Sequence, residues 1–141
     1  PARDVGAVCR RPGYVFPWGE RTSNVTFLGV QFANLNRSSD AMVECLGTLK
    51  REDYRRRAAL IHALANLAGA RRDEPHIADK IYAALRERVF DTAELPQIRI
   101  LSLDYMRKDL GLADAMKLKA MLPKAHTGIR PYFSDYLSEF F

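Results

Sequence analysis

The fold is decided by the stretch LIHALANLAG, residues 60–69. Its apolar residues Leu60, Ile61, Leu64 and Leu67 recur at spacings of three and four, which place them on one face of an α-helix. Gly69 then favours the end of that helix. The stretch predicts a helix over about residues 52–68 with one stripe buried against other helices.

A second stripe follows after a short link. Asp73 offers a side-chain oxygen for an N-cap, and Pro75 falls in the first turn, where its missing N–H is not needed. The positions Ile77, Ile81 and Leu85 continue at helical spacing. Because the link is so short, the two helices are predicted to form an antiparallel hairpin.

The arrangement is repeated farther along the chain. Asp91 and Glu94 have the spacing of a capping box, Pro96 follows in the first turn, and an apolar stripe runs toward Gly111. The stripe of this helix comprises Ile98, Leu101 and Tyr105; that of its partner comprises Leu112, Ala115, Met116, Leu118, Met121 and Leu122, before Pro123. These residues predict a second hairpin.

Shorter helices are expected on either side of the hairpins. Ser39 or Asp40 can cap a helix that runs to about Lys50. Residues 131–141 place four aromatic side chains at helical spacing, and we interpret them as a docking surface for a partner protein: Tyr132, Phe133, Tyr136 and Phe140.

Residues 1–37 differ from the rest, because proline and glycine interrupt them and no helical period can be drawn through them. They predict an extended N-terminal arm, within which residues 25–32 are prone to form a strand. Large rigid aromatic groups in such a segment are typical of interface anchors, although they could equally pack back onto the helices. These residues are Tyr14, Phe16, Trp18 and Phe27.

The composition fits this division into an arm (1–37) and a helical-repeat domain (38–141). The chain has 141 residues, 48% hydrophobic content and a net charge of +5 with basic and acidic residues interleaved, which is typical of a globular domain. Every long apolar run is interrupted by a charge, so no membrane span is predicted. We therefore predict an all-α fold of antiparallel helical hairpins, in the manner of a short α-solenoid.

Two further features bear on the cellular setting. Cys9 and Cys45 are too few for a disulfide framework, so a reducing compartment is the simpler interpretation. The chain begins at Pro1, which is expected of a processed mature form or an excised fragment.

A shift of the chain by 37 residues aligns the two hairpins with each other, for example Ile61 with Ile98 and Leu64 with Leu101. A duplicated hairpin explains this match. Unrelated amphipathic hairpins of similar length would also align, because they share the same apolar period.

The residues 60–69 followed by 77–85 resemble one helix-turn-helix unit of the pentatricopeptide and octotricopeptide repeats, and residues 111–118 are similar to the second helix of another unit. The resemblance covers residues 57–122. It implies a helical-repeat fold and two alternative functions.

The first function implied by the resemblance is that of a protein adaptor. Repeats of this kind include accessory subunits of mitochondrial complexes in protist lineages, among them a pentatricopeptide-like subunit on the F1 part of euglenozoan mitochondrial ATP synthase. The size, the helical hairpins and the N-terminus of this chain are similar to those of that subunit. A mitochondrial location and a role in ATP synthase follow as expectations.

The alternative is binding of single-stranded RNA in an organelle, one base per repeat. The base-reading positions of the first unit would fall near Arg57 and Ala58, and Ala58 has no group that could bond a base edge. Two units are also a short array. Phosphate contacts could still come from Arg55, Arg56, Arg57, Arg71 and Arg72.

No pattern of catalytic residues emerges from the sequence. His62, His76 and His126 lie in separate segments, with no acid or cysteine at the spacing of a triad or of metal ligands. Neither a GxGxxG nor a GxxxxGK[ST] motif occurs. The expected function is therefore non-catalytic, with no cofactor and no metal, in a subunit that binds other proteins of a larger assembly.

Overall fold

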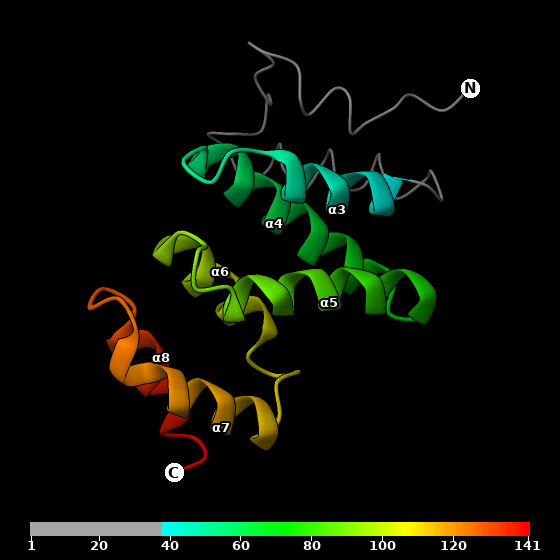
Figure 1. The fold of residues 1–141 in the computed structure, drawn as a ribbon. Coiled ribbons are helices and arrows are strands. Elements are labelled where there is room, and N and C mark those ends of the chain that lie inside the picture. The colour runs from blue at the N-terminus through cyan, green and yellow to red at the C-terminus, as the bar shows by residue number, and fades with distance from the viewer. Residues whose placement is uncertain (1–37) are drawn as a thin grey trace. The chain divides into compact units, whose positions relative to one another are not determined.

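The computed structural model describes residues 38–141, and over this range it consists of helices joined by short turns (Figure 1). The predicted all-α class is confirmed. The elements are α3 (Ser38–Thr48), α4 (Tyr54–Ala70), α5 (Pro75–Phe90), α6 (Pro96–Met106), α7 (Leu112–Met121), the 3-10 turn η1 (Leu122–Lys124) and α8 (Arg130–Leu137). The arm, with its expected strand and the anchors Tyr14, Phe16, Trp18 and Phe27, lies outside the described residues.

The helices begin and end close to where the sequence predicts them. The helix expected over residues 52–68 is α4, and Pro75 and Pro96 are the first residues of α5 and α6. Pro123 falls in η1, directly after α7, because a proline nitrogen cannot continue the hydrogen bonding of a helix. Helical period and proline position therefore suffice to place these elements.

One capping prediction is wrong. Asp91 and Glu94 do not form a capping box at α6, whose N-cap residue is Leu95. Asp91 instead accepts a hydrogen bond from the backbone N–H of Ala93 at 2.9 Å, and the Glu94 carboxylate turns toward Arg88. The acidic pair thus shapes the turn between α5 and α6.

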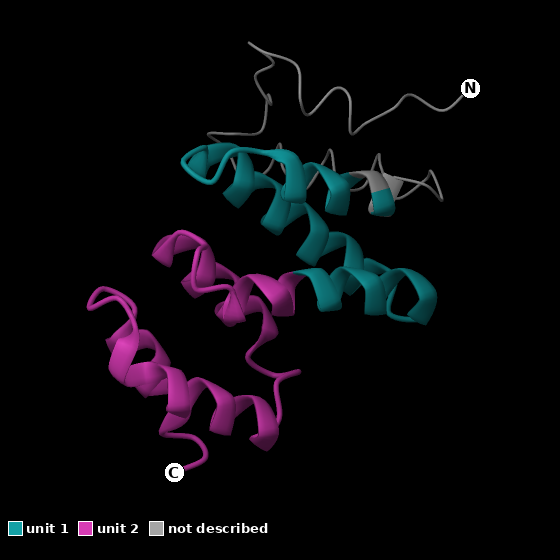
Figure 2. Cartoon of the chain, in the orientation of Figure 1, with its two compact units in different colours: residues 1–84 teal, residues 85–141 magenta. Residues whose placement is uncertain are grey.

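The chain divides into two compact units, and the boundary falls within α5 after Ala84 (Figure 2). Of the described residues, 38–84 belong to unit 1 and 85–141 to unit 2.

In unit 1, α3 packs against α4. The apolar stripe of α4 is buried as predicted, and α3 contributes Met42, Cys45 and Leu46 to the same core. Cys45 is disulfide-bonded. Cys9, the other cysteine of the sequence, lies outside the described residues.

In unit 2, α7 packs against α8 and η1. The buried apolar side chains of this unit come from every one of its α-helices and from the turns between them. They include Leu85, Val89, Ile98, Leu103, Met106, Leu110, Ala115, Leu118, Ile129, Phe133, Tyr136 and Leu137.

Among the described residues, no helix is both long and apolar enough to cross a membrane.

Candidate functional site

The outer face of α7 exposes two large apolar side chains one helical turn apart. Leu112 is 56% exposed and Met116 is 59% exposed, while Ala115 and Leu118 on the other side of the helix are fully buried. Residues at spacing i, i+4 share one face of a helix. A surface helix ordinarily has one apolar stripe, and α7 has two, of which only one is covered.

Charged contacts hold α7 so that this face stays outward. Arg86 near the end of α5 donates from Nε to Asp114 Oδ1 at 3.1 Å, and Asp114 Oδ2 accepts from the backbone N–H of Gly111. The Lys117 ammonium lies 4.3 Å from the centroid of the Phe90 ring. Asp114 and Lys117 therefore tie α7 to the C-terminal part of α5.

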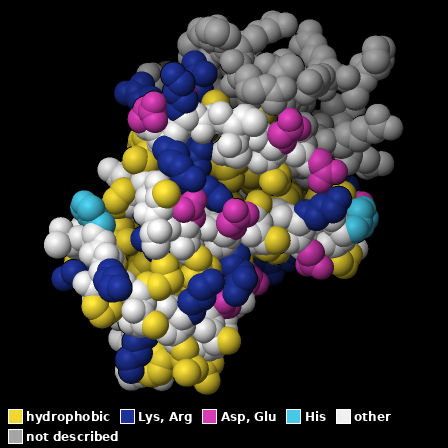
Figure 3. Space-filling view, viewed as in Figure 1, with side chains coloured by type: hydrophobic (Ala, Val, Ile, Leu, Met, Phe, Trp, Pro, Cys, Tyr) yellow, Lys and Arg dark blue, Asp and Glu magenta, His cyan; other side chains and the backbone are white. Residues whose placement is uncertain are grey.

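The apolar face continues toward the C-terminus of the chain. Lys119 lies on the same side of α7 as Met116, and its ammonium is 4.3 Å from the ring centroid of Phe141. Phe141 is itself more than half exposed. Figure 3 shows hydrophobic side chains interrupted by Lys and Arg where α7 and the C-terminus lie. We call Leu112, Met116 and Phe141 the α7 docking surface.

The expected aromatic docking surface of the last helix is largely interior. Phe133 and Tyr136 are fully buried in unit 2, so these two residues do not meet a partner at the surface. The Tyr136 hydroxyl donates to the Leu110 carbonyl at 3.4 Å, and burial raises the pKa of this hydroxyl. Phe140 is half-buried with its ring centroid 5.3 Å from that of Tyr136. Only Tyr132 of the four is well exposed.

Arg107, which directly follows α6, holds α8 to the rest of unit 2. Arg107 donates to Asp135 at 2.9 Å and to Glu139 at 2.8 Å, and these hydrogen bonds raise the pKa of the guanidinium. Its central carbon also lies 5.8 Å from the centroid of the Tyr136 ring. The last helix is thus a structural element of unit 2.

The five arginines proposed as phosphate contacts have different environments. Arg57 is only 2% exposed, and its Nη1 donates to the carbonyls of Leu46 at 2.7 Å and Leu49 at 3.0 Å. A phosphate at the surface cannot reach this guanidinium, so Arg57 is not a phosphate contact. Its role is to satisfy carbonyls at the C-terminal end of α3, which are left without partners inside the helix.

The other four arginines lie nearer the surface of unit 1. Arg56 pairs with Asp53 at 3.4 Å, and Arg71 pairs with Glu74 at 2.8 Å. Arg55 and Arg72 are exposed. The structure therefore does not gather the five into one basic patch.

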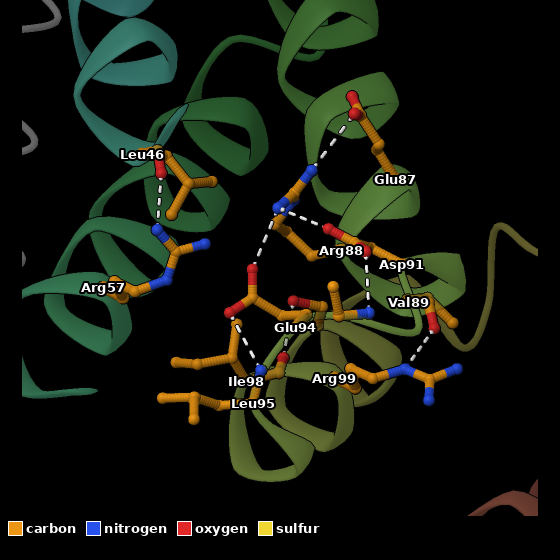
Figure 4. Close-up of polar contacts among 12 residues, drawn as sticks. Leu46, Arg57, Glu87, Arg88, Val89, Asp91, Glu94, Leu95, Ile98 and Arg99 are labelled. Atoms are coloured by element: carbon orange, nitrogen blue, oxygen red, sulfur yellow. Dashed lines mark hydrogen bonds and ion pairs between the residues drawn. The ribbon is translucent and has the colours of Figure 1, made fainter. Parts of the chain in front are cut away.

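Unit 2 contains a buried ionic cluster that sequence reasoning missed (Figure 4). The Glu94 side chain is fully buried and accepts from Arg88 Nη1 at 2.9 Å and from the backbone N–H of Leu95 at 3.1 Å. Arg88 also pairs with Asp91 at 3.2 Å. Each charge in the cluster has an opposite charge beside it, which is the condition for burying ions at tolerable cost.

The histidines do not assemble a catalytic centre among residues 38–141. His62 is half-buried, and desolvation lowers its pKa, whereas His76 and His126 are exposed. Within the described residues no cluster of three His, Cys, Asp or Glu side chains has the geometry of a metal site.

Sequence reasoning assigned Leu112 and Met116 to a buried stripe together with Ala115 and Leu118. Around the axis of a short helix, these four residues cover too wide an arc for one buried stripe. Their wide spread could have predicted that one apolar face of the helix stays exposed.

Comparison with known proteins gives no relative: no protein-family model, no curated protein and no solved structure matches the chain.

Proposed function

We propose that this chain is a non-catalytic accessory subunit that attaches to another protein of a larger assembly through the α7 docking surface. The observation that carries the proposal is the pair Leu112 and Met116, exposed on a helix whose opposite face is already buried. Methionine and leucine are side chains that fill irregular apolar grooves well.

Burial of this surface by a partner would contribute to the free energy of binding. Fully burying one exposed large aliphatic side chain is worth roughly 1.5–3 kcal/mol. Leu112 and Met116 are a little more than half exposed, so a partner that covers both gains roughly 2–3 kcal/mol. Lys117 and Lys119 beside them add positive charge that favours an acidic rim on the partner. The partner is therefore a protein with an apolar groove bordered by carboxylates.

The wider setting of the proposal is a mitochondrial complex such as ATP synthase, and it rests on the resemblance to pentatricopeptide-like subunits alone. The N-terminal arm remains a second predicted contact.

Affinity purification of the tagged chain from its source cells tests the docking surface. The variant Leu112→Ser with Met116→Ser should lose the partners that the unaltered chain retains, because it removes apolar area from the contact. Tyr54→Ser is the matched control, since Tyr54 is a large exposed side chain on unit 1. Circular dichroism should show the same helicity for all three proteins.

Equal recovery of the same partners by the double variant and the control would remove α7 from the proposal. Loss of partners with both variants would point to a contact elsewhere on the chain.

Binding of single-stranded RNA is the alternative, and it has less support. Arg57 is buried, and Arg56 and Arg71 have acidic partners, so most of the proposed phosphate contacts would compete with bonds within unit 1. Fluorescence anisotropy with a labelled 20-nucleotide uridine oligomer at low salt tests it. Salt-sensitive binding that Arg55→Gln with Arg72→Gln weakens would favour RNA, and no binding would dismiss it.

A further inference from the structure

Unit 2 contains a cavity of about 400 Å³ between the turn that precedes α6 and the segment from the end of α7 to Ile129. Its walls combine apolar side chains, such as Pro96, Met121 and Ile129, with Arg99, Lys124 and His126. Cavities of this size hold small organic molecules, which mostly touch apolar walls and are oriented by a few polar groups.

Arg99 is the charged residue of the cavity wall that determines which kind of ligand can bind. It is only 4% exposed, and its Nε donates to the Val89 carbonyl at 2.9 Å. Its central carbon, Cζ, lies over the Phe133 ring, 5.0 Å from the ring centroid. Its Nη2, however, is buried without any hydrogen-bond partner. Figure 4 shows the two terminal nitrogens directed away from Glu94, with no dashed line to either.

A buried arginine nitrogen without a partner is costly, because the group has lost its water and gained nothing in return. This burial lowers the pKa of Arg99, although Asp91 and Glu94 oppose the change. An anion bound in the cavity would supply the missing acceptor.

The balance of charge around the cavity also favours an anion. Among residues 38–141, Glu94 is the one acidic group that lines it, and its carboxylate is already bonded to Arg88 and to the Leu95 N–H. Asp91 is likewise paired with Arg88. The carboxylates Asp91 and Glu94 thus offset the guanidiniums of Arg88 and Arg99, which leaves Lys124 as an additional positive charge in the wall.

The other polar side chains in the wall can donate to an anion. The backbone N–H of Gly128 donates to His126 Nδ1 at 2.9 Å, so the other ring nitrogen, Nε2, is the one that can donate to a ligand. Thr92 adds a hydroxyl. Arginine binds planar carboxylates with two parallel hydrogen bonds, and the apolar walls require a ligand with an apolar body.

We propose that this cavity is a binding site for a small organic carboxylate, whose oxygens accept from the Arg99 guanidinium and from Lys124 while its apolar body lies against Met121 and Ile129. The site is independent of the α7 docking surface.

Nuclear magnetic resonance titration of the full, oxidised chain with 3-phenylpropionate tests the site. We expect saturable shifts of the backbone amides of Thr92, Ala125 and His126 and of the Arg99 Nε–H. 3-Phenylpropionamide, which has the same body without the charge, should bind at least about 10-fold more weakly, since a charge-assisted pair is worth a factor of this order.

Three variants assign the contact. Arg99→Met keeps the length of the side chain and should weaken 3-phenylpropionate at least about 10-fold. Arg99→Lys keeps the charge without the planar fork and should give an intermediate loss, and it serves if the methionine variant fails to fold. Lys108→Ala removes an exposed lysine that does not line the cavity and should change nothing.

Several results would overturn the proposal. They are equal binding of the acid and the amide, shifts that do not saturate or do not map to the cavity, and affinities that are the same in Arg99→Lys and the unaltered chain. Inorganic phosphate that binds as tightly as 3-phenylpropionate would overturn the assignment to a carboxylate. The double variant of Leu112 and Met116 should bind 3-phenylpropionate normally, which separates this site from the proposed docking function.

Discussion

Arg57 in unit 1 and Arg99 in unit 2 occupy the same position in their helices, yet they are used differently. Each is the fourth residue of its helix, α4 or α6, and each is almost completely buried. Each also bonds a carbonyl near the C-terminal end of an earlier helix, at Leu46 of α3 and at Val89 of α5. A cationic side chain at a helix C-terminus is favourable because it meets unsatisfied carbonyls and the negative end of the helix dipole.

The difference lies in the rest of the guanidinium. Arg57 donates to a second carbonyl, that of Leu49, whereas Nη2 of Arg99 has no acceptor and the residue lines a cavity. An arginine whose donors are satisfied stabilises its unit, and one with an unsatisfied donor keeps capacity for a ligand. Burial alone therefore does not separate a structural cation from a binding one.

The largest expected effect belongs to Arg57. Arg57→Met should lower the free energy of unfolding by about 2–4 kcal/mol, because it removes two charge-assisted hydrogen bonds and leaves the carbonyls at the end of α3 unsatisfied. Urea unfolding followed by circular dichroism measures this change. Arg55→Met, two residues earlier and exposed, is the control and should stay within about 0.5 kcal/mol. Equal losses in both variants would show that burial of Arg57 contributes nothing.

The sequence predicted the helices because helical period, proline and glycine act within one segment at a time. The same period could not tell which apolar face another helix covers: Phe133 and Tyr136 are buried by unit 2 itself, whereas Leu112 and Met116 are left exposed. Whether another helix covers an apolar face depends on residues far away in the sequence. The apolar spacing within one helix does not identify those residues.

Buried polar contacts were also beyond the sequence. Arg57 follows two other arginines, so it was interpreted as part of a basic cluster, and Arg99 stands between Ile98 and Ile100 without any motif. Their partners are backbone carbonyls of another helix, and a carbonyl has no sequence signature. An arginine within an apolar stripe is still a useful signal, because such a residue must find acceptors or a ligand when it is buried.

A smaller effect is expected for Arg99. Arg99→Met should change the free energy of unfolding by no more than about 1 kcal/mol in the absence of ligand, because relief of the unpaired Nη2 offsets the lost hydrogen bond to Val89 and the lost contact with Phe133. Urea unfolding beside Arg57→Met makes the comparison direct. A loss as large as that of Arg57→Met would mean that Arg99 is a structural cap of the same kind.

The smallest expected effect is a loss of stability of unit 1 at acidic pH. Desolvation lowers the pKa of His62 in the folded chain, so the folded state binds protons less readily than the unfolded state. Stability is then fully present above the unfolded pKa of about 6.5 and is lost as the pH falls below it. His62→Gln should reduce the difference between unfolding free energies measured at pH 7.5 and pH 5.5, whereas His76→Gln, which alters an exposed histidine, should leave it unchanged. If the protection of the α4 amides from hydrogen exchange, corrected for the intrinsic exchange rate, falls between pH 7.5 and pH 5.5 in the unaltered chain but not in the His62→Gln variant, the acid sensitivity belongs to unit 1. An equal fall in both proteins would assign it to other groups.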